Sequence, residues 1–503
     1  MTIITDINKH TRLQPLLLLA ACLLLSLLYC PPVDIFYDDK EIFRYFGMFI
    51  SRGGVPYRDF FDHKPPLIFF MNLFGPWGLW LIDTFLVTLA SLLFLRTCRQ
   101  YRLPIPWLLP LLFNLLIRNY LICEGVGMTR AYTAVFQLIF FSVMLSTGRF
   151  RYFTMGILAA LIFFMQQDQI MPLLPFLIYT LFSRSAQSSA ATVDPSSITH
   201  IPPPRRWLHL LLGGGLITTI ILLYFGINHA LAAFWNDAFV FNFSWYAEKR
   251  SFAERYRAFK QGLQGTDCEM PLLIALSLSA AALLTKNTPN RRMIVAALIS
   301  TFLAFSPGYI SAKSGKAFYY YYLPFSAALP ILAFTALSFQ RNNFLADKKC
   351  QAFLIFLMGS LPLYNVFQHG THLSLRNKDI VETYPVYDYL RRQPFAINHE
   401  DYQLYIVGDN NWVYTYNKFR ILAPTHWIYH HFWAWYPKWD ADHRQLENCI
   451  EDLIRHQTKY IVYYGPYDWQ DPTAKTIWEN FLHQHYVQTD IPGTQKLLLW
   501  QLK

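Results

Sequence analysis

The sequence predicts a polytopic α-helical membrane protein that ends in a small soluble α/β domain. Of its 503 residues, 54% are hydrophobic and only 15% are charged, whereas soluble domains carry about 25% charged residues. Apolar stretches close to the ~20 residues that a bilayer-spanning helix needs recur up to about residue 367. After about residue 400, short strand-like and helix-like segments replace them.

We expect about eleven apolar stretches to cross the membrane as helices. They cover residues 13–30, 67–95, 104–120, 131–147, 152–165, 169–182, 207–227, 270–285, 292–309, 318–339 and 349–367. The fifth and sixth are short for a bilayer about 30 Å thick, and we expect them to be tilted or broken.

Lys and Arg gather in alternate connections, which predicts a cytoplasmic N-terminus by the positive-inside rule. The opposite, outer side then receives the loops 31–66, 121–130 and 228–269 and everything after about residue 368. The net charge of +11 lies mostly in short cytoplasmic connections rather than on one face. This distribution excludes a nucleic-acid-binding protein and favours contact with membrane lipids.

The predicted organisation is a transmembrane core over 1–367, a connector over 368–399 and a soluble outer domain over 400–503. A Ser/Ala/Pro-rich cytoplasmic linker occupies 183–206, and charged residues at helical spacing over 246–260 predict an interfacial helix. In the C-terminal domain, strands are expected at 404–408, 459–465, 486–491 and 496–502, with helices at 447–457 and 474–484.

The first outer loop is the most charge-dense stretch between two predicted spans. A short amphipathic helix is expected from Ile42 to Ile50, with Phe46 and Phe49 on its apolar face. Glycines at 53–54 end this helix, and prolines at 65–66 stiffen the start of the next span. Charge held in this way at a membrane surface indicates a site rather than a linker.

The loop carries acidic groups at its head and basic groups at its tail. Asp38 and Asp39 can act as a general base or hold a divalent cation, or they can cap the helix that follows. Arg58, His63 and Lys64 can bind the phosphate of a lipid carrier, or they can extend to lipid headgroups. An acid beside a phosphate clamp suggests transfer of a group carried on a lipid phosphate.

The segment VPYRDFFDHKPPL, preceded by Asp39 and IFRYFG, resembles the first outer loop of integral-membrane glycosyltransferases with the GT-C fold. That group includes bacterial aminoarabinose transferases and protein O-mannosyltransferases. The resemblance implies transfer of a hexose or pentose from a polyprenyl-phosphate donor, at the outer face of a bacterial inner membrane. The acceptor can be a lipid, a polysaccharide or a protein.

The resemblance also implies residue roles. Asp39 would be the catalytic or acceptor-orienting carboxylate with Asp38 beside it, and Lys64 would face the donor phosphate. Arg58 and His63 would assist Lys64. A later segment, GKAFYYYYLPF, resembles an outer-facing motif of the same family and adds Lys316 to the phosphate-binding set.

The chain departs from the family pattern at several positions. Lys40 follows the loop aspartate where glutamate is common, and Arg130 stands where the family has the glutamate of T-E-x-Y. Gln166 lies near a position where the family often has a lysine, and Tyr320 stands where a histidine is expected. Neither the sugar nor the acceptor follows from these differences.

Three more residues are candidates for substrate contact. Tyr320 and Tyr321 can stack on a sugar ring, or they can belong to an interfacial aromatic belt. Glu124 can serve as a second carboxylate, with which a divalent metal is possible, or it can be a solvated loop residue.

The sequence predicts no firm metal site and no certain cofactor. His426, His430 and His431 have metal-like spacing, but no Cys or Asp nearby completes a ligand set. The cysteines form no CxxC pair, although Cys123 and Cys268 are both expected outside, where they can pair or stay free thiols.

Two other functions stay open. One is a lipid-carrier transporter or flippase, for which Asp83, an acidic residue deep in a predicted span, would be the functional charge. The other is a catalytically degenerate family member that binds glycolipid without turnover.

Overall fold

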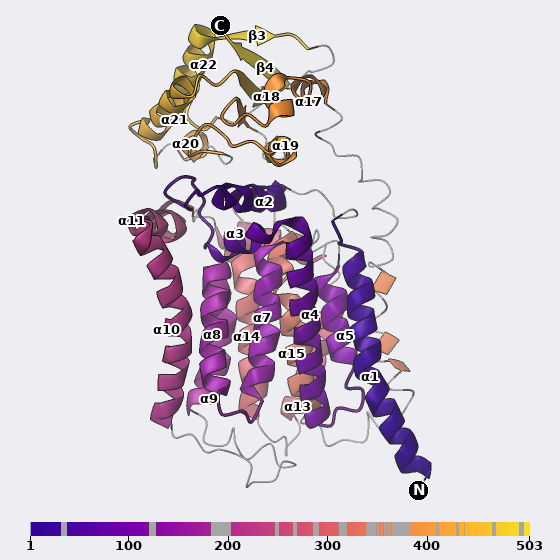
Figure 1. The fold of residues 1–503 in the computed structure, drawn as a ribbon. Coiled ribbons are helices and arrows are strands. Elements are labelled where there is room, and N and C mark those ends of the chain that lie inside the picture. Colours follow the sequence, from indigo (N-terminus) through magenta and orange to yellow (C-terminus); the bar gives the residue numbers. More distant parts are fainter. Residues whose placement is uncertain are drawn as a thin grey trace. The chain divides into compact units, whose positions relative to one another are not determined.

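The computed structural model describes most of the chain. The described residues are 2–31, 38–119, 127–182, 203–246, 251–264, 269–284, 291–310, 319–338, 384–408, 412–428, 432–436, 438–464, 469–491 and 497–503, with a few single positions between 349 and 381. Figure 1 shows the course of these segments.

The chain forms two compact units, and it passes through each more than once. The helical unit comprises Met1–Asp34, Trp77–Tyr224 and Ala247–Ser374, and the loop-and-sheet unit comprises Ile35–Pro76, Phe225–Tyr246 and Leu375–Lys503. The first predicted outer loop therefore packs with the C-terminal part of the chain. The domain boundaries inferred from sequence at about 367 and 400 stay predictions.

The helical unit is a bundle of helices that stand side by side (Figure 1). Its elements are α1 (Thr2–Leu27), α4 (Gly75–Gln100), α5 (Leu108–Ile117), α7 (Thr129–Met144), α8 (Arg151–Met165), η2 (Gln167–Leu173), α9 (Leu174–Phe182), α10 (Pro203–Ile227), α12 (Phe252–Gln264), α13 (Glu269–Leu284), α14 (Arg291–Ile310), η7 (Tyr319–Tyr322) and α15 (Phe325–Ser338). Helix α15 is apolar all round and lies buried against α5, α7, α13 and α14, as expected of a helix without a polar face.

Several helices expose apolar side chains that water would disfavour. On α10, Leu211 is 64% exposed and Ile220 is 55% exposed. Within the described residues, two helical stretches, Leu67–Gln100 and Arg205–Ile227, are long and apolar enough to cross a membrane by length and composition. Shorter apolar helices lie at five other predicted spans. A total of about eleven crossings stays a prediction.

The predicted span at 67–95 is not one regular helix. It begins as α3 (Leu67–Met71), continues as the 3-10 turn η1 (Asn72–Phe74) and becomes α4 only at Gly75. Gly75 has φ 65°, a left-handed conformation that suits glycine, and the Asn72 amide donates to the Ile68 carbonyl. The Gly-Pro pair at 75–76 is the sequence feature that marks this break.

The sheet of the loop-and-sheet unit confirms the strands and helices predicted after residue 400. Four strands lie in the order β1-β2-β4-β3, with β1 parallel to β2 and β4 antiparallel to both β2 and β3. The strands are β1 (Leu404–Val407), β2 (Tyr460–Tyr464), β3 (Tyr486–Thr489) and β4 (Leu497–Leu502), and the two predicted helices are α21 (Arg444–Arg455) and α22 (Pro472–His485). Tyr405, Ile461, Leu453 and Trp478 lie in the shared core.

The remaining elements of this unit are short. They are α2 (Asp38–Ser51), α11 (Leu231–Trp235), the π-helical turns η5 (Asn236–Val240) and η6 (Asn242–Tyr246), α17 (Pro385–Leu390), α18 (Pro394–Asn398), α19 (Val413–Phe419) and α20 (Phe432–Trp435). Helix α2 confirms the predicted amphipathic helix, because Ile42 and Phe46 are fully buried. Its Tyr45 ring packs on Tyr416 of α19 at 5.4 Å between ring centroids.

Candidate functional site

A tight loop over residues 55–64 fixes the backbone of Lys64. Tyr57 adopts φ 67°, a left-handed conformation that costs free energy for a bulky residue. Its N–H donates to the Phe60 carbonyl at 3.0 Å, and its hydroxyl donates to the Lys64 carbonyl at 2.6 Å. Asp62 accepts from the Lys64 N–H at 2.7 Å. The strained Tyr57 backbone is thus used to hold Lys64 in place.

The structure brings Asp39 and Lys64 together. The Lys64 ammonium lies 3.7 Å from Asp39 Oδ1, and the two side chains are 13% and 12% exposed. The same ammonium lies 5.1 Å from the centroid of the Phe43 ring, a favourable cation–π distance. Two residues from opposite ends of the predicted loop therefore form one largely buried charged pair.

The capping alternative for Asp39 is wrong. Helix α2 already includes Asp38, so Asp39 is its second residue rather than the flanking residue that a cap requires. A carboxylate in the first turn still interacts favourably with the helix dipole. The side chain of Asp38 lies outside the described residues.

Arg58 is engaged within the same loop. Its Nε and Nη2 donate to the two Asp59 oxygens at 2.7 and 2.8 Å, and its Nη1 donates to the Asn228 carbonyl at 3.0 Å. Burial opposes ionisation of Asp59, but hydrogen bonds from Arg58 and the Val55 N–H hold the pKa of Asp59 below its ordinary value. This guanidinium is already neutralised, so its phosphate-binding role stays a prediction.

His63 is largely buried beside the same loop. Its backbone carbonyl accepts from the Asn242 amide at 2.5 Å, and its ring lies 6.1 Å from that of Phe241. The segment 225–246 therefore supports the tail of the first loop from one side.

A second acidic group, which no local sequence pattern indicates, lies close to Asp62. Burial, reinforced by the charge of Asp62, raises the pKa of Asp237 to about 8. Burial and the same two carboxyl groups raise the pKa of Tyr57 well above its ordinary value. Tyr57 is therefore a neutral donor to Lys64 at any physiological pH.

Helix α2 is tied to the C-terminal part of the same unit. The Asn417 amide donates to the Glu41 carbonyl and to Glu41 Oε2, both at 2.8 Å. The Ala423 N–H donates to the Tyr45 hydroxyl at 2.8 Å. The C-terminal region therefore fixes the helix that carries Asp39.

Of the candidates in the helical unit, Tyr321 is the one whose side chain the structure describes. Glu124 and Lys316 lie outside the described residues, and so does the side chain of Tyr320. Tyr321 is buried, and its ring centroid lies 4.4 Å from the guanidinium carbon of Arg130. Its role in binding substrate stays a prediction.

Arg130, which departs from the family pattern, forms an ion pair with Asp168. Arg130 is 4% exposed and donates from Nη2 to Asp168 Oδ2 at 3.1 Å. A basic residue thus replaces the glutamate of the pattern, while an acidic one lies near where the family often has a lysine.

Asp83 does not offer a free charge for transport. Arg118, at the end of α5, donates to its carboxylate, and both residues are buried. Paired buried charges of this kind are costly to separate. Asp83 therefore gives the transporter alternative little support.

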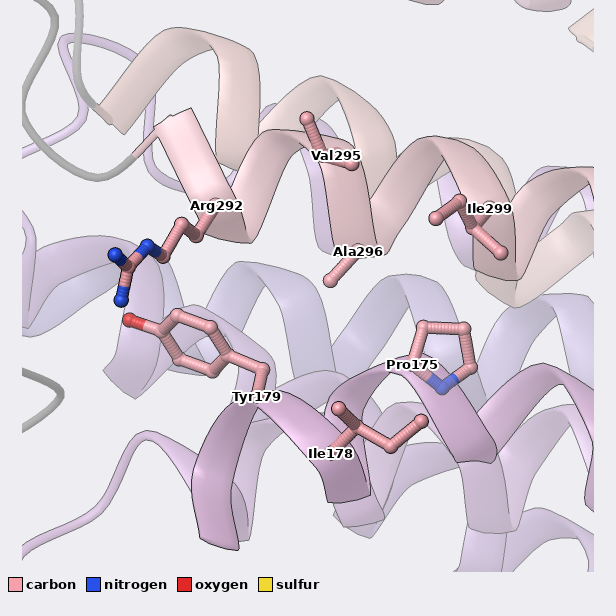
Figure 2. Close-up of a pocket in the computed structure, with 7 residues that line it drawn as sticks. All are labelled: Pro175, Ile178, Tyr179, Arg292, Val295, Ala296 and Ile299. Carbon is pink, nitrogen blue, oxygen red and sulfur yellow. The ribbon is translucent and has the colours of Figure 1, made fainter. Parts of the chain in front are cut away.

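Helices α9 and α14 border an apolar pocket of about 330 Å³. Figure 2 shows Val295, Ile299 and Ile178 around it, with the Arg292 guanidinium beside the Tyr179 hydroxyl at one end. Such a lining suits an apolar chain, and the cation lies at the end expected to face the cytoplasm.

His426 lies in an aromatic environment. Burial lowers its pKa to about 4, and its ring packs against those of Phe61 and Trp427. His430, His431, Cys123 and Cys268 lie outside the described residues. Among the described residues, no three His, Cys, Asp or Glu side chains gather as metal ligands would.

Comparison with known proteins identifies the fold. No protein-family model matches the chain, and no curated protein matches it. The structure of ArnT from Cupriavidus metallidurans bound to undecaprenyl phosphate matches with a TM-score of 0.58 and 12% identity, over 96% of this chain and 97% of that chain. Its apo state matches with a TM-score of 0.56 and 11% identity, over the same shares.

A third structure, the oligosaccharyltransferase of Archaeoglobus fulgidus with Zn and sulfate, gives a TM-score of 0.38 at 14% identity, over 89% of this chain and 68% of that chain. At such low identities the ArnT likeness establishes architecture rather than activity. Over nearly its whole length, this chain has the GT-C fold.

Proposed function

We propose that the protein is a polytopic membrane glycosyltransferase that moves a sugar from a polyprenyl phosphate to an acceptor. The observation that carries this proposal is the largely buried Asp39–Lys64 pair, held by a strained loop. The shared fold with ArnT, whose structure binds undecaprenyl phosphate, supports a polyprenyl-phosphate donor. The acceptor is a lipid, a polysaccharide or a protein.

Lys64 binds the donor phosphate in this proposal. Its ammonium meets Asp39 at 3.7 Å, longer than an ordinary charged hydrogen bond. A donor phosphate, which offers more than one oxygen, can therefore replace Asp39 as the partner of the Lys64 ammonium. Charge neutralisation then lets the phosphate leave the anomeric carbon with the bonding electrons.

Asp39 acts on the acceptor once Lys64 turns to the phosphate. Its carboxylate orients the acceptor hydroxyl or amine and takes its proton as that group attacks the anomeric carbon. The bond from the anomeric carbon to the phosphate oxygen breaks as the new glycosidic bond forms. This single displacement inverts the anomeric configuration.

Other residues support these two. Tyr57 and Asp62 fix the Lys64 backbone, while His63, Arg58 and Lys316 are secondary candidates for the phosphate. Tyr320, Tyr321 and Glu124 are candidates for the sugar or the acceptor.

The proposed location is a bacterial inner membrane, with the N-terminus in the cytoplasm and the C-terminal domain in the periplasm or outside the cell. The Lys/Arg asymmetry of the short connections supports this orientation. The exposed apolar faces of α10 and its neighbours support the membrane location.

Mass spectrometry of envelope glycolipids, polysaccharides and glycoproteins tests the function. A strain that lacks the gene is compared with the same strain carrying a wild-type copy. One product that loses a single sugar mass on deletion and regains it with the wild-type copy supports the transferase and identifies the acceptor. An unchanged set of glycans would favour a transporter or a degenerate glycolipid-binding protein.

A further inference from the structure

One end of the helical unit holds a buried polar cluster around Arg130. Arg130 lies in the first turn of α7, Asp168 and Gln169 lie in η2 directly after α8, and Tyr321 lies in η7 just before α15. Helices α7 and α8 pack against each other, and so do α7 and α15. Three connections of the bundle therefore bring polar groups to one place.

The ion pair between Arg130 and Asp168 is monodentate, with one hydrogen bond instead of two. Only Nη2 and Oδ2 meet, at 3.1 Å, although an arginine and a carboxylate commonly form two parallel hydrogen bonds. Within the described residues, Arg130 Nη1 and Asp168 Oδ1 are both buried and have no hydrogen-bond partner. A donor and an acceptor are thus left on adjoining groups.

Gln169 adds a second acceptor to this place. Its side chain is fully buried, and its Nε2 donates to Asp168 Oδ2 at 3.3 Å. In the part of the chain that the structure describes, its Oε1 has no hydrogen-bond partner. The cluster accordingly presents one strong donor and two acceptors whose atoms are buried, although the Asp168 side chain as a whole is 32% exposed.

These atoms match the chemistry of neutral hydroxyl groups. A hydroxyl both donates and accepts, so one hydroxyl can accept from Arg130 Nη1 and donate to Asp168 Oδ1. A neighbouring hydroxyl can donate to Gln169 Oε1. A carboxylate or phosphate fits poorly, because Asp168 already neutralises the arginine and its free oxygen repels an anion.

An aromatic wall borders the cluster. The Tyr321 ring is buried against the Arg130 guanidinium at 4.4 Å, which holds the planar guanidinium in one orientation. Thr129 and Gln166 join α7 to the start of η2 through a 3.0 Å hydrogen bond. The Gln137 amide donates to the Gln169 carbonyl at 3.2 Å. The donor and acceptors are therefore preorganised rather than mobile.

We propose that Arg130, Asp168 and Gln169 form a subsite for the hydroxyl groups of a neutral sugar. This inference rests on the proposed function and deepens it, because it assigns a class to the transferred sugar. A site built to hydrogen-bond hydroxyl groups rejects analogues that lack them. The subsite selects a neutral hydroxylated ring over a uronic acid.

Affinity measurements on the purified full-length protein in lipid nanodiscs test the subsite. The probes are undecaprenyl phosphate and its glucose, galactose, mannose and glucuronic acid conjugates. The wild type is expected to bind at least one neutral conjugate about tenfold more tightly than undecaprenyl phosphate. The glucuronic acid conjugate should show no such gain.

Two variants isolate the sugar contact. Arg130→Lys keeps the positive charge and the ion pair but removes the second donor, Nη1. Asp168→Asn keeps the shape of the side chain but removes its negative charge. Both should lose the gain from the neutral sugar while their affinity for undecaprenyl phosphate is unchanged. A purely structural ion pair would survive Arg130→Lys, so an unchanged ratio of affinities in that variant overturns the subsite.

Control measurements separate the subsite from the proposed function. Lys64→Ala, which alters only the proposed phosphate contact, should leave the preference for a neutral conjugate over the glucuronic acid conjugate unchanged. If no neutral conjugate gains over undecaprenyl phosphate in the wild type, the subsite is wrong whatever the activity. If Asp39→Asn transfers sugar at the wild-type rate while the ratios behave as expected, the catalytic assignment fails and the subsite stands.

Discussion

Lys64 Nζ lies 3.7 Å from Asp39 Oδ1, and this pair joins the first turn of α2 to the His-Lys-Pro-Pro segment that ends the loop. The distance is too long for a strong hydrogen bond but close enough for each charge to stabilise the other. Both side chains are largely withdrawn from solvent. The pair is thus part of the folded protein itself, with the ammonium held beside the carboxylate.

Lys64 and Arg58 should differ strongly in their effect on activity. Lys64→Ala should lower kcat/KM about 100-fold or more, because it removes the proposed contact to the donor phosphate. Arg58→Ala should lower it less than about tenfold, because Asp59 already binds that guanidinium. Transfer kinetics of the two purified variants with the same donor check this ranking. Equal losses of kcat/KM in the two variants would mean that Arg58 also contacts the phosphate.

The carboxyl pair at Asp237 predicts a pH dependence of stability. Its pKa of about 8 lies above the ordinary value of 3.8, so the folded protein binds the extra proton between these values. The contribution to the free energy of unfolding is fully present below about pH 4 and is lost as pH rises to about 8. The side chain that Asp237→Asn introduces is neutral at every pH, so this variant should lack the pH dependence. Its Tm should exceed that of the wild type at about pH 8, where Asp237 becomes a buried charge.

Thermal unfolding of wild type and Asp237→Asn at several pH values measures this effect. The exposed Asp388 on α17, which pairs with Arg391 and Arg392 directly after that helix, offers a matched control. Asp388→Asn should leave the pH profile unchanged. Parallel profiles for wild type and Asp237→Asn would show that Asp237 titrates in the folded protein as it does in the unfolded chain.

The contact between Arg52 and Asp401 should respond unequally to its two truncations. Arg52 donates to Asp401 Oδ1 at 2.8 Å, and the buried Leu422 N–H donates to the same oxygen at 2.8 Å. Arg52→Ala should cost only about 0.2–1 kcal/mol, as partly exposed ion pairs do. Asp401→Ala should cost about 1–3 kcal/mol, because it also leaves the Leu422 N–H unsatisfied. Equal changes in Tm would contradict this difference.

Much of the fold follows from local patterns in the sequence. The strands at β1, β2, β3 and β4 and the helices α21 and α22 lie where short apolar runs and helical periodicity predict them. Helix α2 follows from the spacing of Ile42, Phe46 and Phe49. These features depend on the side-chain period of a single element, which a sequence displays directly.

The candidate site was predictable only in part. Family resemblance indicates Asp39 and Lys64, and their charges are obvious, but nothing local shows that Glu41 binds Asn417 or that Asp237 lies beside Asp62. Such contacts join segments far apart in the chain and leave no periodicity. Arg130 was visible as a departure from the family pattern, but its pairing with Asp168 depends on the packing of α7 on α8 and could not be read from the sequence.

Close packing of α8 on α10 predicts different effects at three glycines. An added Cβ would lie 2.0 Å from the Leu210 carbonyl oxygen at Gly156 and 2.0 Å from the Phe153 carbonyl oxygen at Gly213, whereas at Gly215 nothing lies within 4 Å. Small residues allow such close helix contact in membranes. Gly156→Ala and Gly213→Ala should destabilise the protein by about 1–3 kcal/mol.

Gly215→Ala is the matched control for these substitutions. It should be neutral, or stabilise by up to about 1 kcal/mol through helix propensity. Thermal unfolding of the three variants in one detergent compares them. If Gly215→Ala lost as much stability as Gly213→Ala, the effects of Gly156→Ala and Gly213→Ala could not be assigned to the α8–α10 contact.

In the proposed mechanism the Asp39 carboxylate acts in sugar transfer, and complementation of the deletion strain is the sharpest test of this role. Mass spectrometry compares the affected envelope glycan in strains that carry wild type, Asp39→Asn or the exposed control Asp388→Asn, at matched protein levels. We predict that wild type and Asp388→Asn restore the missing sugar and that Asp39→Asn does not. Full restoration by Asp39→Asn would rule out this role for Asp39, because an amide cannot accept the proton of the acceptor.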